Sequence, residues 1–217
     1  MKRKILKRPL KAAHSEFQPH ARSFGEIQGE IHMINIRKYE EKDKENMRKV
    51  CLETSSFDVA DRKTSEFITL MFCDYYTEVE PDSCFVAADE NGDAVGYLIC
   101  GKNFDEYYKV FNGLYMPEIR KLGLKYAFMA KSEIAVHRLF SKRYPAHLHI
   151  DLLDVCRHQG VGSRLMKELK KYLSDKGIPG LMLSCGYNNK NAIRFYERNG
   201  FKKIANIFGS CIMAIKL

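Results

Sequence analysis

The chain has 217 residues, of which 45% are hydrophobic and 12% aromatic, and it carries a formal net charge of +9 at pH 7. This composition is typical of a globular chain with one domain, alone or with a tail, and it excludes disordered and collagen-like proteins. The sequence contains neither a secretory signal nor an apolar run near the about 18–20 residues that a transmembrane helix needs. We therefore expect a cytoplasmic protein that does not bind a membrane.

The cysteines argue against both disulfides and structural zinc. There are seven of them, an odd number, at positions 51, 73, 84, 100, 156, 185 and 211, without Cys-x-x-Cys spacing. A disulfide framework usually has an even set, and a zinc cluster usually has closely spaced pairs. The pattern instead favours free thiols in a reducing compartment.

The first segment differs from the rest of the chain, because six of its first eleven residues are Lys or Arg and its apolar residues show no sustained periodicity. We predict a basic tail over residues 1–32, ahead of a domain over residues 33–217. A transit peptide and a nucleic-acid-binding arm are also basic and poor in acids, so both alternatives stay open for this segment. We find no nucleic-acid recognition motif, and we do not expect nucleic acid as a partner.

The first half of the predicted domain alternates between strand and helix patterns. We predict, in chain order, a strand, two helices and two strands, over residues 34–39, 42–52, 64–76, 84–89 and 94–100. Thr64 is expected to cap the second helix. Asn91-Gly92 lies between the last two strands and is a strong signal for a β-hairpin.

An insert follows over residues 102–143, rich in aromatic side chains and with helical spacing around residues 118–140. A loop of this length without structure of its own would be unusual in a compact domain. We therefore predict helices here. Their purpose stays open between plain packing and covering one side of a binding site.

Residues 148–169 suggest a binding site for phosphate. A strand-length apolar run over residues 148–153 passes through Gly160 and Gly162 into a helix whose apolar face carries Leu165, Met166 and Leu169. Glycines let a backbone approach a ligand closely, and the free N–H groups of a first helical turn bind anions. A tight turn without a ligand is the alternative.

Two common phosphate motifs are excluded at this turn. The Walker motif needs a Lys directly after the second glycine, and the dinucleotide fingerprint needs a glycine where His158 stands.

Beyond the turn we predict a strand over residues 180–185, a helix over residues 189–199 and closing strands over residues 202–207 and 210–216. The order of elements predicts a mixed α/β domain around one central sheet.

Two motifs resemble those of the Gcn5-related N-acetyltransferase (GNAT) family. Arg-x-x-Gly-x-Gly at residues 157–162 is similar to the family's pyrophosphate loop, and residues 189–201 resemble its second signature, Asn-x-x-Ala-x-x-(apolar)-Tyr-Glu-x-x-Gly-Phe. The resemblance covers roughly residues 34–217. Residues 144–151 are also similar to the acetyltransferase-like module related to protein O-linked N-acetylglucosaminidases.

The resemblance implies a GNAT-type mixed central β-sheet flanked by helices, with the helical insert between the third and fourth strands. It also implies acetyl-coenzyme A as co-substrate and an amine as acceptor, on a small molecule, an N-terminus or a lysine. We expect an N-acetyltransferase that is a monomer or a homodimer. A cofactor-binding or interaction module with little or no catalytic activity is the alternative from another class.

The resemblance further implies which residues hold the cofactor. The backbone of the loop would bind the pyrophosphate, with added charge from Arg157, and backbone groups of Leu152 and Leu153 would bind the pantetheine arm and the thioester carbonyl. Asn189 and Asn191 suit further cofactor contacts or a helix cap. The predicted cofactor residues are Leu152, Leu153, Arg157, His158, Gln159, Gly160, Val161, Gly162, Ser163, Asn189, Asn191 and Tyr196.

Acetyl transfer needs a deprotonated amine, a stabilised oxyanion and a proton for the departing thiolate. Tyr196 matches the family's proposed general acid, and a phenol is neutral at pH 7. For the general base we choose Asp151 first and His149 second, because with His147 they alternate along one face of their strand. That spacing is not a sharp zinc signature, so we predict no metal.

Overall fold

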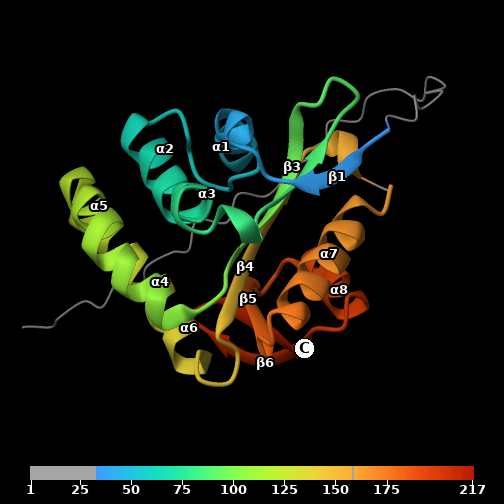
Figure 1. Cartoon of the computed structure of the whole chain (residues 1–217). Coiled ribbons are helices and arrows are strands. Elements are labelled where there is room, and N and C mark those ends of the chain that lie inside the picture. Colours follow the sequence, from blue (N-terminus) through green and yellow to red (C-terminus); the bar gives the residue numbers. More distant parts are fainter. Residues whose placement is uncertain (1–32, 158) are drawn as a thin grey trace, which may run out of the picture. The chain divides into compact units, whose positions relative to one another are not determined.

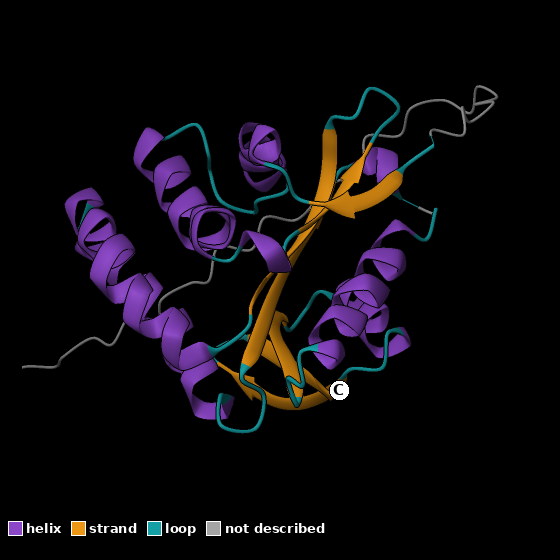
Figure 2. Ribbon diagram, in the orientation of Figure 1, coloured by secondary structure: helices purple, strands orange, loops and turns teal. Residues whose placement is uncertain are grey.

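The computed structural model describes residues 33–157 and 159–217; residues 1–32, predicted to be a tail, and His158 lie outside the described residues. The described residues contain one seven-stranded sheet with the order β1-β2-β3-β4-β5-β7-β6 (Figures 1 and 2). Only β4 and β5 pair in parallel; the other neighbours are antiparallel. The strands are β1 (Asn35–Lys38), β2 (Phe85–Ala88), β3 (Ala94–Gly101), β4 (Ala146–Leu152), β5 (Gly180–Gly186), β6 (Lys202–Ile207) and β7 (Ser210–Lys216).

Helices cover both faces of this sheet (Figure 1). One face carries α1 (Lys44–Glu53), α2 (Arg62–Thr69), α3 (Tyr75–Val79), α4 (Phe104–Val110), α5 (Met116–Leu122) and α6 (Leu124–Phe140). The other face carries α7 (Val161–Asp175) and α8 (Lys190–Arg198). This confirms the predicted mixed α/β class with flanking helices. None of the described helices is long and apolar enough to cross a membrane.

The two cores follow from the period-2 alternation of the central strand β3. Tyr97 and Ile99 pack among the helices α1 to α6, whereas Leu98 and Cys100 pack against α7. Successive side chains of a strand point to opposite faces, so both faces of β3 must be apolar to be covered by helices. All four of these side chains are fully buried.

The second predicted helix is present, but its cap is not Thr64. Helix α2 begins at Arg62, and the side chain of Asp61 accepts a hydrogen bond from the Thr64 amide at 3.1 Å. The Thr64 hydroxyl donates to the same carboxylate at 2.7 Å. Asp61 has the extended backbone of an N-cap residue, so the helix starts two residues earlier than predicted. A π-helical turn over Leu70–Asp74 then joins α2 to α3.

The insert lies between β3 and β4, as predicted, and it is helical. Helices α4 and α5 flank a second π-helical turn over Phe111–Tyr115, and α6 follows. Hydrogen bonds tie the insert to the helices before it, from the Tyr115 hydroxyl to Glu78 at 2.6 Å and from the Tyr126 hydroxyl to Asp61 at 3.0 Å. The C-terminal half of α6 packs through Val136 on the face of β5 and β7.

The sheet is split between β4 and β5. Their parallel pairing comprises only Ala146↔Leu181 and His147↔Met182. Beyond these pairs β4 continues along β3 as far as Leu152, and β5 continues along β7 as far as Gly186. The carboxyl-terminal halves of the two strands therefore have unpaired facing edges, and in open α/β sheets ligands bind at such ends.

The core beneath α7 gives a test of this arrangement. Leu169 is fully buried among the residues that join α7 to the sheet. We expect Leu169→Ala to lower the free energy of unfolding by about 2–5 kcal/mol, because it leaves a cavity in a packed core. Denaturant unfolding measures this, with Lys167→Ala, on the exposed side of the same helix, as the control. Equal losses in both variants would contradict the packing of α7 described here.

Candidate active site

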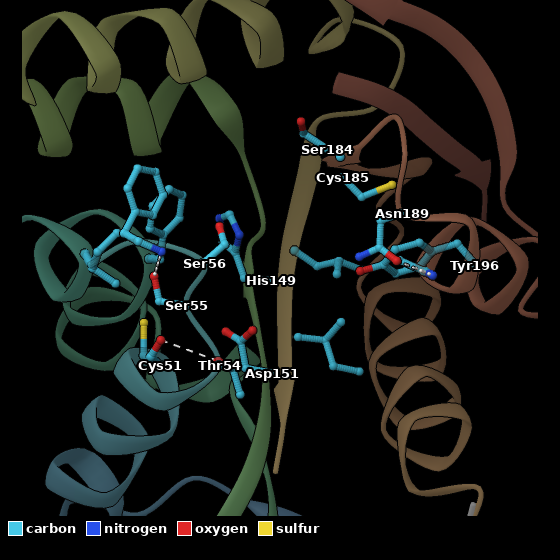
Figure 3. Close-up of a pocket in the computed structure, with 17 residues that line it drawn as sticks. Cys51, Thr54, Ser55, Ser56, His149, Asp151, Ser184, Cys185, Asn189 and Tyr196 are labelled. Atoms are coloured by element: carbon cyan, nitrogen blue, oxygen red, sulfur yellow. Dashed lines mark hydrogen bonds between the residues drawn. The ribbon is translucent and has the colours of Figure 1, made fainter. Parts of the chain in front are cut away.

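A cavity of about 400 Å³ occupies the split between β4 and β5. Figure 3 shows its two sides: His149 and Asp151 face the segment of Ser55 and Ser56, whereas Tyr196 and Asn189 lie across β4 from them. The cavity thus has walls from the sheet, from α8 and from the end of α1. Its lining comprises Cys51, Thr54, Ser55, Ser56, Phe57, Ile68, Phe72, Leu148, His149, Ile150, Asp151, Ser184, Cys185, Gly186, Asn189, Ala192 and Tyr196.

A second cavity of about 980 Å³ adjoins the first, since Asn189 lines both. Its lining includes three arginines, Arg157, Arg194 and Arg198, and, within residues 33–157 and 159–217, a single acidic side chain, Glu197. A concave surface with a positive balance attracts a polyanion. The two cavities thus meet at Asn189: the second is polar and basic, and the first, smaller one lies inside the split.

The start of α7 provides anion-binding backbone groups beside these cavities. Gly160 is the N-cap residue and has a left-handed φ of 68°. Because glycine has no side chain, the helix has no side-chain cap. The first bond of the helix runs from the Arg164 amide to the Gly160 carbonyl at 3.0 Å. The N–H groups of Val161, Gly162 and Ser163 therefore have no partner within the helix. The helix dipole adds to their attraction for an anion.

The two glycines of the motif serve different purposes. A Cβ on Gly160 would meet open space, so the left-handed backbone is what demands glycine there. A Cβ on Gly162 would lie 3.0 Å from the ring of Phe195 and 3.2 Å from Leu152. Gly162 thus also lets α7 pack closely on its neighbours, a second reason for glycine at this position.

The remaining loop side chains lie at the surface. Arg157 is exposed and pairs with Asp154 at 2.8 Å, and the Gln159 side chain donates to a carbonyl of its own loop at 2.7 Å. Ser163 is exposed on the first turn of α7, and His158 lies outside the described residues. The contacts of this loop with a phosphate would therefore come mainly from its backbone.

The backbone of Leu153 is not free for a cofactor. Its N–H donates to Val95 at 3.0 Å, and its carbonyl accepts from the Cys156 amide at 2.9 Å. Leu152 stands opposite Gly96, and alternate residues of an antiparallel strand direct their backbone groups to opposite edges. The backbone of Leu152 therefore faces the split. The prediction that both leucines offer backbone groups is corrected to Leu152 alone.

Helix α8 places the predicted asparagines and tyrosine differently. Asn189 caps the helix by accepting from the Ala192 amide at 3.0 Å. Asn191 lines only the second cavity, where Arg194 donates to it at 3.1 Å. Tyr196 is buried against Phe201 and lines the first cavity. Burial raises the pKa of Tyr196, so its phenol stays protonated at neutral pH.

Among the residues that the structure describes, Asp151 is the only acidic side chain that lines the first cavity. Tyr97, its partner in register on β3, donates a hydrogen bond to this carboxyl. Burial nevertheless raises the pKa of Asp151 above its usual value. A partly desolvated carboxyl of this kind is a better proton acceptor than an exposed one.

His149 shares the cavity with Asp151, but His147 does not. The Nε2 atoms of both histidines lie 3.0 Å from the hydroxyl of Tyr76. His149 reaches the cavity, and burial lowers its pKa to about 4. His147 is buried in the core, which also lowers its pKa. Among the described residues no group of His, Cys, Asp and Glu is arranged to hold a metal ion.

Sequence reasoning missed two parts of the site. Thr54, Ser55 and Ser56 form the wall opposite β5, and nothing in a short polar loop after a helix indicates which strand it will face. Arg194 and Arg198 could have been found, because residues four apart on a helix lie on one side. The helix predicted over residues 189–199 contains both arginines and begins at Asn189.

Comparisons with known proteins give a family and a set of similar folds. A family model described as the acetyltransferase (GNAT) family matches residues 47–201, more than half of the chain. The chain is also similar to the crystal structure of a protein named SsHAT, at 24% identity and a TM-score of 0.75, over 84% of this chain and 98% of that one.

Two further solved structures have a similar fold. One is the PaiA N-acetyltransferase of Thermoplasma acidophilum in complex with coenzyme A, at 18% identity and a TM-score of 0.54, over 85% of this chain and 99% of that one. The other is a polyamine N-acetyltransferase of Drosophila melanogaster, at 18% identity and a TM-score of 0.56, with the same coverage of 85% and 99%.

The buried histidine of the cavity predicts acid sensitivity. A histidine with a pKa of about 4 in the folded protein and about 6.5 when unfolded lets the unfolded chain bind more protons between those values. The free energy of unfolding should therefore rise with pH from about 4 to about 6.5, by up to about 1.4 kcal/mol per pH unit for this group. Thermal unfolding at several pH values from 4.5 to 7 measures this. The stability of His149→Gln should rise less steeply with pH than that of the wild type. The raised pKa of Asp151 acts with the opposite sign in both proteins, so it largely cancels in the comparison. Equal slopes would contradict a neutral His149.

Proposed function

Because the chain belongs to the acetyltransferase (GNAT) family, we propose that it transfers an acetyl group to the amine of a small acceptor held in the cavity between β4 and β5. Members of this family are N-acetyltransferases that use acetyl-coenzyme A, and this chain is such an enzyme. The observation that supports the site is the split itself, with the uncapped start of α7 beside one end.

The cofactor is placed along the two adjoining cavities. Its pyrophosphate lies at the free N–H groups of Val161, Gly162 and Ser163, together with the backbone of Gln159 and Gly160. Its phosphorylated nucleotide lies among the arginines of the second cavity. Its pantetheine arm enters the split, where the Leu152 N–H serves as the donor to the thioester oxygen. Asn189 and Asn191 border this path.

The chemical step uses groups from the two sides of the split. Tyr196 remains protonated and donates to the departing thiolate. Asp151 and His149, on the other side, face the acceptor, and both can take its proton. Asp151 is our first candidate for the base because its pKa is raised, and His149, neutral at physiological pH, is our second.

The lining of the cavity favours a particular class of amine. Asp151 is its single carboxyl, whereas Thr54, Ser55 and Ser56 contribute hydroxyls. The polyamine N-acetyltransferase of Drosophila forms N-acetylagmatine, so its acceptor carries a guanidinium cation besides the amine that is acetylated. One carboxyl partners one ammonium, and a second buried cation would lack a partner. We therefore propose a monoamine with a body that forms hydrogen bonds.

The setting of the enzyme is also proposed. All seven cysteines are free and six of them are buried, which supports a reducing compartment such as the cytoplasm. We propose that residues 33–217 act as the acetyltransferase domain, as a monomer or a homodimer and without nucleic acid. The similarity of residues 144–151 to the module related to O-linked N-acetylglucosaminidases supports the alternative, a cofactor-binding module of low activity.

Cofactor binding is tested by thermal unfolding with and without acetyl-coenzyme A. At about one hundred times its Kd the ligand should stabilise the wild type by roughly 2.7 kcal/mol. Gly160→Glu should lose this stabilisation, because it places a carboxylate at the anion-binding turn. Gly177→Glu is the matched control, since Gly177 has the same φ of 68° and equally open space at the other end of α7. A wild type without a shift, or a shift that survives in Gly160→Glu, would contradict this cofactor site.

Catalysis is tested by thiol release from acetyl-coenzyme A with ethanolamine, tyramine, agmatine and spermidine as probe amines. The monoamines should have the higher kcat/KM. Tyr196→Phe should lower kcat by about 10²-fold with little change in the KM for acetyl-coenzyme A, because it removes only a proton donor. Tyr172→Phe, on α7, is the control, because it removes a tyrosine hydroxyl that bonds Asp82 outside the site. Cofactor binding without release for any amine would favour the low-activity module.

A further inference from the structure

A row of polar side chains leads from the cavity into the core of the insert. Behind His149 stand Tyr76 of α3, His147 of β4 and His137 of α6, and these three are only 1–3% exposed. Buried polar groups in such a number are unusual unless they are paired or functional. The acetyl-transfer groups described above do not account for them.

The row is continuous within short distances. The Tyr76 hydroxyl lies 3.0 Å from Nε2 of His149 and 3.0 Å from Nε2 of His147. The His147 and His137 rings follow with centroids 5.0 Å apart. Nε2 of His137 lies 3.4 Å from Oε1 of Glu133, whose side chain is 28% exposed. The row thus begins at the cavity and ends at the surface.

The hydroxyl in the middle makes the two β4 histidines complementary. A phenol has one proton, so Tyr76 can donate to one imidazole while it accepts from the other. When His149 donates from Nε2, its Nδ1 is a free acceptor for the cavity, and His147 accepts at Nε2 and carries its proton on Nδ1. Both tautomers reverse when a proton enters at Nδ1 of His149, a proton shifts through the hydroxyl, and a proton leaves from Nδ1 of His147.

The next two nitrogens of the row are poorly partnered. Nδ1 of His147 is buried and has no hydrogen-bond partner among the described residues, and Nε2 of His137, also buried, has only its 3.4 Å contact with Glu133 there. Leaving a buried polar group unpaired costs about 1–3 kcal/mol. The two rings are adjacent, so a proton passed between them, directly or through one water, would give both nitrogens a partner.

We propose that Tyr76, His147, His137 and Glu133 form a relay that carries the acceptor's proton from His149 to the surface. The inference rests on the proposed function, because it needs an ammonium in the cavity. It assigns part of the insert a task beyond packing. Tyr76, His147, His137 and Glu133 do not touch the substrate and act through His149.

Each step moves one proton and no other bond changes. The ammonium gives its proton to Nδ1 of His149, and Nε2–H of His149 passes to the Tyr76 oxygen. The Tyr76 proton moves to Nε2 of His147, and the Nδ1 proton of His147 moves to Nε2 of His137. The result is a neutral amine and a His137 imidazolium. Glu133 stabilises that charge: burial opposes its ionisation, but the bond and the charge of His137 lower its pKa.

The neighbours of the row favour this direction. Tyr75, Tyr107 and Cys100 pack around Tyr76, and burial raises the pKa of all three, so they stay neutral. Asp151, by contrast, bonds Tyr97 in the core and Thr54 at the cavity, and both residues lie outside the row. The relay therefore concerns His149, the second candidate for the base, and not Asp151.

The relay is tested by the rate of acetyl transfer to ethanolamine. Tyr76→Phe should lower kcat by about 10²-fold, the scale of general acid–base catalysis, and leave the KM for acetyl-coenzyme A unchanged. Glu133→Gln should lower kcat less, because it removes only the stabilising charge. Proton inventories in mixed light and heavy water should indicate several protons in flight for the wild type and fewer for Tyr76→Phe.

The matched control is Tyr75→Phe. It also removes a buried tyrosine hydroxyl from α3, one that bonds Glu80 at 2.7 Å outside the row. Its kcat and proton inventory should match the wild type after a thermal scan has confirmed folding. An unchanged kcat in Tyr76→Phe, or an equal fall in both variants, would overturn the relay.

A second measurement does not depend on activity. Nitrogen-15 spectra of the imidazoles should show opposite tautomers for His147 and His149 in the free wild type, and Tyr76→Phe should remove this correlation. The same tautomer in both rings would overturn the relay. Absence of transfer to every amine, with opposite tautomers present, would count against the proposed function and not against the relay.

Discussion

The structure depends on an interruption of backbone hydrogen bonding in the middle of its sheet. β4 and β5 bond at two residue pairs and then separate, while β3 and β7 hold their outer edges. Backbone groups at an interior edge need partners. An extended ligand with amide groups, such as the pantetheine arm of acetyl-coenzyme A, suits that edge and connects the start of α7 with the groups on β4.

The two sides of the split differ in a way that fits two substrates. The α7 and α8 side supplies backbone amides, arginines and Tyr196, which suit an anionic cofactor. The other side supplies hydroxyls, Asp151 and His149, which suit a polar amine. The insert lies behind this second side, and its His137 and Glu133 extend the polar groups of β4 to the surface. The helices of the insert would then both pack against the sheet and provide the residues of the proposed proton relay.

Several parts of this fold and site could be read from the sequence. The closing strands at residues 202–207 and 210–216 were predicted with their observed bounds, because alternation and a Gly-containing turn are local signals. The glycine turn before α7 and the capping Asn189 are local signals as well. Thr64 was misassigned because Asp61, three residues earlier, competes for the same cap. Leu153 was misassigned because its edge depends on the register with β3.

The local pattern of the chain was enough to establish the fold class, the family resemblance and the loop where the cofactor binds in that family. Those features arise within short windows, through periodicity, turn chemistry and helix ends. The local pattern could not establish that Gly162 is needed for contact with Phe195 or that the loop of Ser55 faces β4. Nor could it establish that Tyr76 joins two histidines more than seventy residues away. Such contacts form between segments distant in sequence, so they exist only once the sheet and its helices have packed.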